Sequence, residues 1–371
     1  MKFSYNLHNL FKFTINTKNK DIRKWFDREN HLFIDKDSKN SDLYIDIRNI
    51  SFKRDFYEVK DVYINKEDYS LIKKAPANKL SKQKNFIFRF YNILENKPVR
   101  IVTNCDNPNY LQHLIIENFM RYRANFKNCA LIHGACFGKG NNSHVFFALG
   151  GTGKTIATLN LVSKGYEFLS DDLTYISKNG FAYSYQRSLH FNHKTHESLK
   201  HLLMRKRISQ SKSAWIETLK FFSSIAPENL RLFAQRILPF DLLPTLVEHI
   251  NIDEVIPDVK YRKKSKIKTV SMIIKTNGKD ITVHDNIGYE ELAYRAALET
   301  HIELLSLGDM WKCFEYASLV QKSNQIFDFY RREIEILKSA FKGKRCFIIE
   351  IPQHFSIEDY INKITKIINK K

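Results

Sequence analysis

The strongest constraint on this fold is one octapeptide, Ala-Leu-Gly-Gly-Thr-Gly-Lys-Thr, at residues 148–155. It follows the apolar run 145–147 and precedes a segment, 156–164, with the pattern of a helix. Strand, glycine-rich turn, Lys-Thr and helix, in this order, are typical of a phosphate-binding loop. Glycines let backbone N–H groups turn inward without Cβ clashes, and the N-terminus of a helix attracts anions. One position departs from the motif, because Ala148 replaces its leading glycine.

This loop predicts a site for ATP with Mg²⁺. We expect Lys154 to reach the β- and γ-phosphates and the Thr155 hydroxyl to be a metal ligand. The residues expected to surround the phosphates are Gly150, Gly151, Thr152, Gly153, Lys154 and Thr155.

Two aspartates follow the loop at an informative place. The helix should end at Gly165, and a short strand over 166–170 leads directly into Asp171 and Asp172. A strand–helix–strand crossover is normally right-handed and joins parallel strands, so both strands end at the same edge of the sheet. The aspartates should therefore lie beside the phosphate-binding loop. One carboxylate there can hold Mg²⁺, and the other can accept a proton from an attacking hydroxyl.

A third element lies upstream, over residues 129–138. It reads as another strand, with His133 in its middle, and a turn over 141–144 makes it a hairpin with the strand before the loop. A single histidine in an apolar strand is more often a hydrogen-bonded core residue than a catalytic one. Its spacing alone therefore leaves both roles open.

Taken together, three segments resemble the HPr kinase/phosphorylase family: Leu131–Gly134, Ala148–Thr155 and Gly165–Asp172. This family belongs to a wider group with a phosphoenolpyruvate-carboxykinase-like P-loop fold. The resemblance implies a phosphate-binding role for Lys154 and a metal ligand at Thr155. It also implies that Asp172 accepts the proton in phosphoryl transfer and that His133 is an active-site residue. Asp171 would then support the metal.

The chain resembles a divergent member of this family. The match covers Leu131 to Ile176, whereas the family carries an acidic residue where this chain has Ile156 and a Glu-containing signature that is absent after Asp172. We therefore expect an ATP-dependent kinase that phosphorylates a hydroxyl of a protein, a peptide or a small molecule. The alternative is a nucleotide-binding sensor without phosphoryl transfer. A polynucleotide kinase is a third interpretation, based on charge alone.

The net charge of the chain does not by itself identify a binding partner. Sixty basic and 40 acidic residues give a net charge of +20. This surplus is either a compositional bias or the mark of an anionic acceptor, and the densest basic run is 261–268, with a second at 205–207. No RNA-binding motif accompanies it, so nucleic acid is a minority alternative. Homo-oligomerisation is also open.

Compartment and fold class follow from the rest of the composition. The five cysteines show neither a CxxC pair nor the spacing of a zinc site. The sequence also lacks an apolar run of membrane-spanning length and the apolar core of a signal peptide. These features predict a cytoplasmic protein. We expect a mixed α+β fold with a phosphoenolpyruvate-carboxykinase-like P-loop core. The expected domains are a β-rich region over 1–95 and a P-loop domain over 96–371 with a helical insert at about 195–260.

Overall fold

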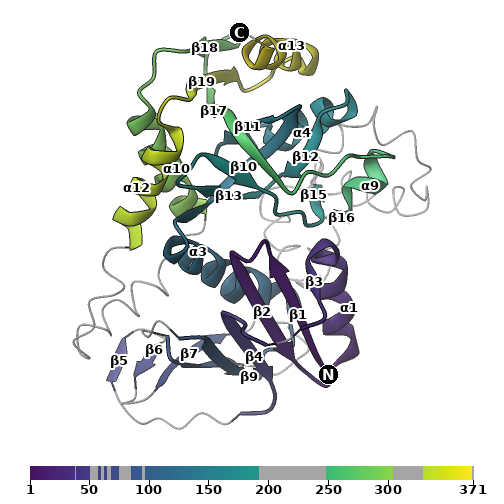
Figure 1. Ribbon diagram of the computed structural model, residues 1–371, viewed down its shortest axis with the longest axis vertical. Coiled ribbons are helices and arrows are strands. Elements are labelled where there is room, and N and C mark those ends of the chain that lie inside the picture. The colour runs from purple at the N-terminus through teal and green to yellow at the C-terminus, as the bar shows by residue number, and fades with distance from the viewer. Residues whose placement is uncertain are drawn as a thin grey trace, which may run out of the picture. The chain divides into compact units, whose positions relative to one another are not determined.

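The protein has a mixed α+β fold built on two large mixed sheets (Figure 1). The computed structural model describes residues 1–37, 39–50, 57–59, 62–64, 68–74, 85–93, 97–191, 248–303 and 329–369. Contacts divide the chain into two compact units. The first contains residues 1–73, 86–187 and 260–371, and the second contains 74–85 and 188–259.

The N-terminal sheet has nine strands in the order β3-β1-β2-β4-β9-β8-β7-β6-β5. Its strands are β1 (Lys2–Leu7), β2 (Phe11–Asn16), β3 (Ile34–Asp35), β4 (Leu43–Ile47), β5 (Tyr57–Val59), β6 (Val62–Ile64), β7 (Asp68–Lys74), β8 (Asn85–Tyr91) and β9 (Val99–Thr103). Helix α1 (Lys20–Glu29) and the short η1 (His31–Phe33) follow β2. The β-rich character expected here is confirmed. Within the alternating stretch 57–64, β5 and β6 form an antiparallel pair, because an alternating pattern does not reveal where a chain reverses.

The second sheet carries the phosphate-binding loop. It has eight strands, seven of them in the order β11-β10-β13-β14-β17-β19-β18, with β12 paired to β10. The strands are β10 (Cys129–Lys139), β11 (Asn142–Phe147), β12 (Glu167–Ser170), β13 (Leu173–Ser177), β14 (Phe181–Tyr183), β17 (Lys264–Thr276), β18 (Thr282–His284) and β19 (Arg345–Pro352). Because β11 also pairs with β17, part of the sheet closes into a ring.

Strand β10 organises this sheet around the loop. It is antiparallel to β11 on one side, and to β12 and β13 in succession on the other. Strands β11 and β12 therefore run in the same direction, as the crossover predicted, with β10 between them. The predicted hairpin of β10 and β11 is also confirmed.

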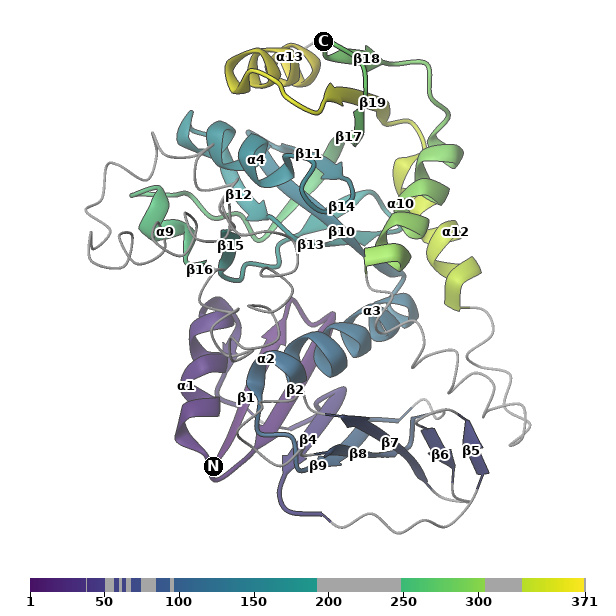
Figure 2. The ribbon, with the colours of Figure 1, turned by 180° about the vertical axis from the view of Figure 1, so that it is seen from behind.

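Helices cover both faces of the second sheet (Figure 2). Helices α10 (Tyr289–Glu303) and α12 (Phe329–Phe341) pack side by side on one face, where alanines of α10 meet aliphatic residues of β10, β11, β17 and β19. Helix α4 (Lys154–Ser163) packs on β10, with α13 (Ile357–Asn369) against α4. A continuous helical segment, α2 (Pro108–Tyr110), the π-helical η2 (Leu111–Ile116) and α3 (Glu117–Phe126), precedes β10.

The described part of the second unit is small. Strands β15 (Leu189–Phe191) and β16 (Glu248–Ile250) form an antiparallel ladder, and the four-residue helix α9 (Ile252–Val255) follows. Most of the helical insert expected at about 195–260 lies outside the described residues. Within its described end, the expected helix is wrong at 248–250, because these residues pair with β15 as a strand.

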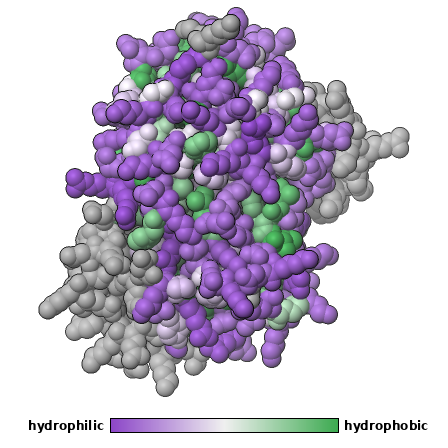
Figure 3. Space-filling model, viewed as in Figure 1, coloured by the Kyte–Doolittle hydropathy of each residue, from purple (hydrophilic) through white to green (hydrophobic). Residues whose placement is uncertain are grey.

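The described surface is largely hydrophilic on the face shown in Figure 3, with small scattered hydrophobic patches. Among the described residues, no helix is both long and apolar enough to span a membrane.

Candidate functional site

The phosphate-binding loop connects β11 to α4, as its sequence predicted. Gly151 and Gly153 adopt positive φ angles of 75° and 98°, and α4 begins at the next residue, Lys154. The Lys154 ammonium is buried and donates hydrogen bonds to the carbonyls of Ala148 and Leu149, the latter at 3.5 Å. Burial lowers the pKa of Lys154, and the nearby carboxylates partly oppose this shift. The lysine is thus folded back within the loop, beside the amides that would face phosphate.

Thr155 and Asp171 meet at the start of α4. The Thr155 hydroxyl donates a hydrogen bond to Asp171 Oδ2 at 2.9 Å. The other oxygen, Oδ1, is buried and has no hydrogen-bond partner in the described structure. Burial, and then the charge of Asp172, raises the pKa of Asp171 to about 6. A hydroxyl and a carboxylate with a spare oxygen are donors that Mg²⁺ prefers, so these residues fit the metal expected from the sequence.

His133 and Asp172 form the second half of the site. His133 Nε2 lies 3.1 Å from Asp172 Oδ1. The two residues are neighbours because β10 changes partner from β12 to β13 at this point, and Asp171–Asp172 make the turn between those strands. The backbone reinforces the junction, since Gly134 N–H donates to the Asp172 carbonyl at 2.9 Å. Asp172 keeps about 40% of its side chain exposed, so it is open to an incoming group.

Residue 134 has to be glycine for this arrangement. A Cβ atom there would lie 2.8 Å from the carbonyl oxygen of Phe146 on β11. Real Cβ contacts essentially never come so close, so any side chain would push β10 away from β11. Glycine after His133 is thus required by the close approach of β11, the strand before the loop, to β10.

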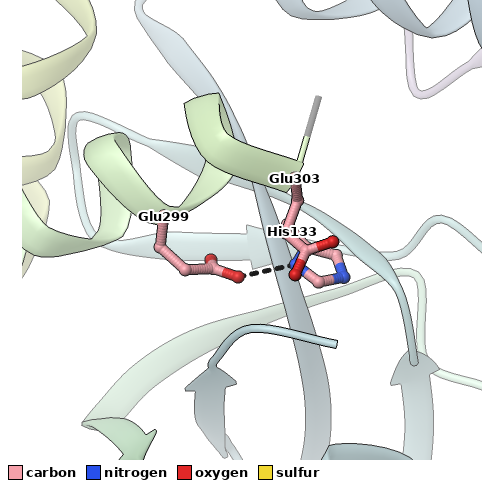
Figure 4. A group of neighbouring side chains, drawn as sticks. All are labelled: His133, Glu299 and Glu303. Carbon is pink, nitrogen blue, oxygen red and sulfur yellow. Dashed lines mark hydrogen bonds and ion pairs between the residues drawn. The ribbon is translucent and has the colours of Figure 1, made fainter. Parts of the chain in front are cut away.

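Helix α10 supplies a carboxylate that the sequence did not reveal. Glu299 Oε1 accepts a hydrogen bond from His133 Nδ1 at 2.7 Å, as the dashed line in Figure 4 marks. Next to it, the Thr300 hydroxyl accepts the backbone N–H of His133 at 2.9 Å. Burial opposes protonation of His133, but its hydrogen bonds to Asp172 and Glu299 outweigh burial and raise its pKa to about 9. His133 is therefore an imidazolium that links two carboxylates at neutral pH.

Figure 4 also shows Glu303 beside the same imidazole. Ligand atoms of His133, Glu299 and Glu303 lie within 4.8 Å of one another, a spacing that could hold a metal ion. A protonated imidazole has no lone pair for a metal, however, and both of its nitrogens are already engaged with carboxylates. We therefore interpret His133, Asp172 and Glu299 as an ion-pair network, with Glu303 beside it.

Arg187 binds the other oxygen of Asp172. Its Nη2 lies 2.6 Å from Asp172 Oδ2, and its Nη1 forms an ion pair with Glu117 Oε1 on α3. Glu117 is fixed in turn by Gln112 and by His113 Nδ1 at 3.0 Å. Burial opposes ionisation of Glu117, yet the charges of Arg187 and His113 outweigh it and lower its pKa to about 2. Both oxygens of Asp172 thus face a cation.

The charges of the assembled residues do not balance. The five carboxylates belong to Glu117, Asp171, Asp172, Glu299 and Glu303, and the four facing cations are Lys154, His133, Arg187 and protonated His113. This group therefore has a surplus of negative charge. A nucleotide triphosphate is itself a polyanion, so it can enter only with cations that offset this charge.

All the site residues expected from the sequence come together in the first unit: the loop 150–155, Asp171, Asp172 and His133. Sequence reasoning missed Glu299, Glu303, Arg187 and Glu117. Glu299 and Glu303 are four apart in a helix, so their sequence places them on one face, but that spacing is common. Arg187 stands alone in a polar segment and carries no local signal.

Comparison of the chain with models of known protein families gave no match, and comparison with curated proteins gave no match either.

Proposed function

We propose that this protein is an ATP-dependent phosphotransferase with a phosphoenolpyruvate-carboxykinase-like P-loop core, related to the HPr kinases. It would transfer the γ-phosphoryl group of ATP to a hydroxyl. One observation carries the proposal: a partly exposed carboxylate, Asp172, stands next to the Gly-Lys-Thr loop and next to Asp171, whose carboxylate accepts the Thr155 hydroxyl. A site that only binds nucleotide has no need of a base at this position.

The roles of the residues follow from their positions. The loop amides and Lys154 would hold the phosphates, and Thr155 and Asp171 would hold Mg²⁺, which neutralises charge on the transferred group. Asp172 would accept the proton of the acceptor hydroxyl. The imidazolium of His133 orients this carboxylate through its 3.1 Å contact, and Glu299 orients the imidazolium. Arg187 must leave Oδ2, or share it, for that oxygen to act as a base.

A nucleotide sensor is the second candidate function. The observation that favours it is the pairing of both Asp172 oxygens with cations, which occupies the oxygens that a general base would use. In this case nucleotide binding would rearrange the ion pairs without phosphoryl transfer.

Two measurements separate these functions. Calorimetry with Mg·ATP should show binding by the wild type and by Lys164→Ala, an exposed lysine at the end of α4, but not by Lys154→Ala. γ-Labelled ATP and fractionated lysate should then show label on an acceptor with the wild type and Lys164→Ala, but not with Lys154→Ala. Binding without transfer would identify a sensor, and unchanged binding by Lys154→Ala would refute the loop assignment.

A further inference from the structure

A carboxylate from the same chain occupies the phosphate-binding loop. The backbone N–H of Gly150 donates a hydrogen bond to Glu303 Oε1 at 2.5 Å. Glu303 is the last described residue of α10, and it reaches the loop from a distant part of the sequence. The two residues are separated by 153 positions, so the contact is a tertiary one.

The group that Glu303 contacts is one that phosphate would need. Gly150 is among the loop residues whose amides surround the phosphates in this motif. A carboxylate resembles one edge of a phosphate group, because both present two anionic oxygens to N–H donors. Glu303 also acts electrostatically on the buried Lys154, which is the lysine expected to bind the β- and γ-phosphates. Its carboxylate thus interacts with both kinds of group that a phosphate would use.

Nothing in the described structure suggests that Glu303 serves to stabilise the fold. Its side chain is exposed to solvent, and so is its hydrogen bond to Gly150. Glu299, one turn earlier, differs in every respect, since it is buried and bound to His133. A surface carboxylate contributes little to stability. Its contact with the loop is therefore better explained by the site than by packing.

We propose that Glu303 is an internal ligand of the phosphate-binding loop, which nucleotide must displace in order to bind. This inference rests on the proposed nucleotide-binding function. The displaced segment is the end of α10, and the preceding turn of this helix carries Glu299 and Thr300, which both hold His133. Entry of a phosphate at Gly150 is thereby coupled to the residue that orients Asp172.

The test compares Mg·ATP affinities of four proteins by calorimetry: the wild type, Glu303→Gln, Glu303→Ala and Glu291→Gln. Loss of the competing charge should lower the Kd for Mg·ATP about five- to tenfold in both Glu303 variants, the size of one charge-assisted hydrogen bond. Glu291 is an exposed residue of the same helix that pairs with Arg295, so Glu291→Gln should keep the wild-type Kd. Inorganic pyrophosphate, used as a second probe, should show the same order of affinities.

The outcomes distinguish this inference from the proposed function. An unchanged Kd in both Glu303 variants, with normal binding by the wild type, overturns the inference and leaves nucleotide binding intact. A higher Kd in these variants also overturns it, because Glu303 would then assist binding, for example through the metal. Absence of ATP and pyrophosphate binding by all four proteins refutes the proposed function and the inference together.

Discussion

The imidazole of His133 and the carboxylate of Asp172 meet at 3.1 Å where β10 exchanges β12 for β13 as its neighbour. One residue belongs to a central strand and the other to the turn between two strands. Their contact joins the glycine-rich loop, Asp171 and the charged side chains of α3 and α10 into one candidate site.

The first prediction separates the two adjacent aspartates. Asp172→Asn should lower turnover roughly 10²-fold or more while ATP affinity is largely kept, because it removes the general base. Asp171→Asn should instead weaken Mg·ATP binding, since Asp171 shares the metal position with Thr155. Calorimetry and steady-state ATP turnover measure the two effects. If Asp171→Asn lost turnover at normal affinity and Asp172→Asn stayed active, the assigned roles would be reversed.

The second prediction concerns pH. The pKa of His133 is raised from its ordinary 6.5 to about 9, so its ion pairs stabilise the folded state fully below about pH 6.5. This stabilisation is lost as pH rises through 9, and its size is on the order of 3 kcal/mol at most. Urea denaturation between pH 6 and 10, values that bracket this window, should show the decline.

The matched control for this pH effect is the double variant His133→Gln/Glu299→Gln, which removes the imidazolium and its buried partner together. Its stability should vary less with pH over the same window. An equally steep decline in the double variant would show that another group causes the pH dependence.

The third prediction concerns the buried pair of Arg187 and Glu117. Arg187→Met should destabilise the fold by about 3–5 kcal/mol, because Glu117 is left charged and buried. Adding Glu117→Gln should restore most of this loss, although turnover should stay low because Asp172 still lacks its partner. Arg295→Met, which breaks an exposed pair with Glu291, should cost less than about 1 kcal/mol. Denaturation curves that show no recovery in the double variant would contradict the assigned pairing.

The fourth prediction concerns the basic run 261–268, which includes the first residues of β17. Arg262 is paired with Glu167, and Lys264 lies 4.3 Å over the ring of Phe181, so these two cations already have partners within the chain. Lys263 and Lys266 are exposed. If the acceptor is anionic, charge reversal at these two lysines should raise the acceptor KM and leave ATP hydrolysis unchanged.

Salt provides an independent check of this idea. Exposed charges are screened beyond about 8 Å at physiological ionic strength, so the acceptor KM of the wild type should rise clearly with salt. Lys20→Glu in α1 is a control for net charge alone. A KM that does not respond to salt would indicate that the basic surplus is compositional.

The parts of the site that could be predicted are local in sequence or follow from crossover geometry. Glycines and a Lys-Thr pair between a strand and a helix identify the loop, and the crossover places Asp171 beside Thr155. Helix α10 buries Glu299 and Thr300 while Tyr294, Leu298 and Ile302 are exposed. Its hydrophobic pattern therefore shows neither which face is buried nor which strand that face covers, so the contact of Glu299 with His133 could not be predicted.

Other residues carry no pattern at all. Arg187 matters because a buried Glu117 on another element faces it, and such a pair depends on how α3 packs. The same holds for Glu303, whose meaning depends entirely on its contact with Gly150. Long-range contacts of this kind leave no signal in the local sequence.

The β15–β16 ladder brings together two parts of the chain that are far apart in sequence. Phe191 pairs with Glu248, so the chain leaves and returns at adjacent points. Closing a longer loop costs only slightly more entropy than closing a shorter one. A segment can therefore be lengthened, shortened or exchanged at this ladder at small entropic cost, while its two ends stay next to each other.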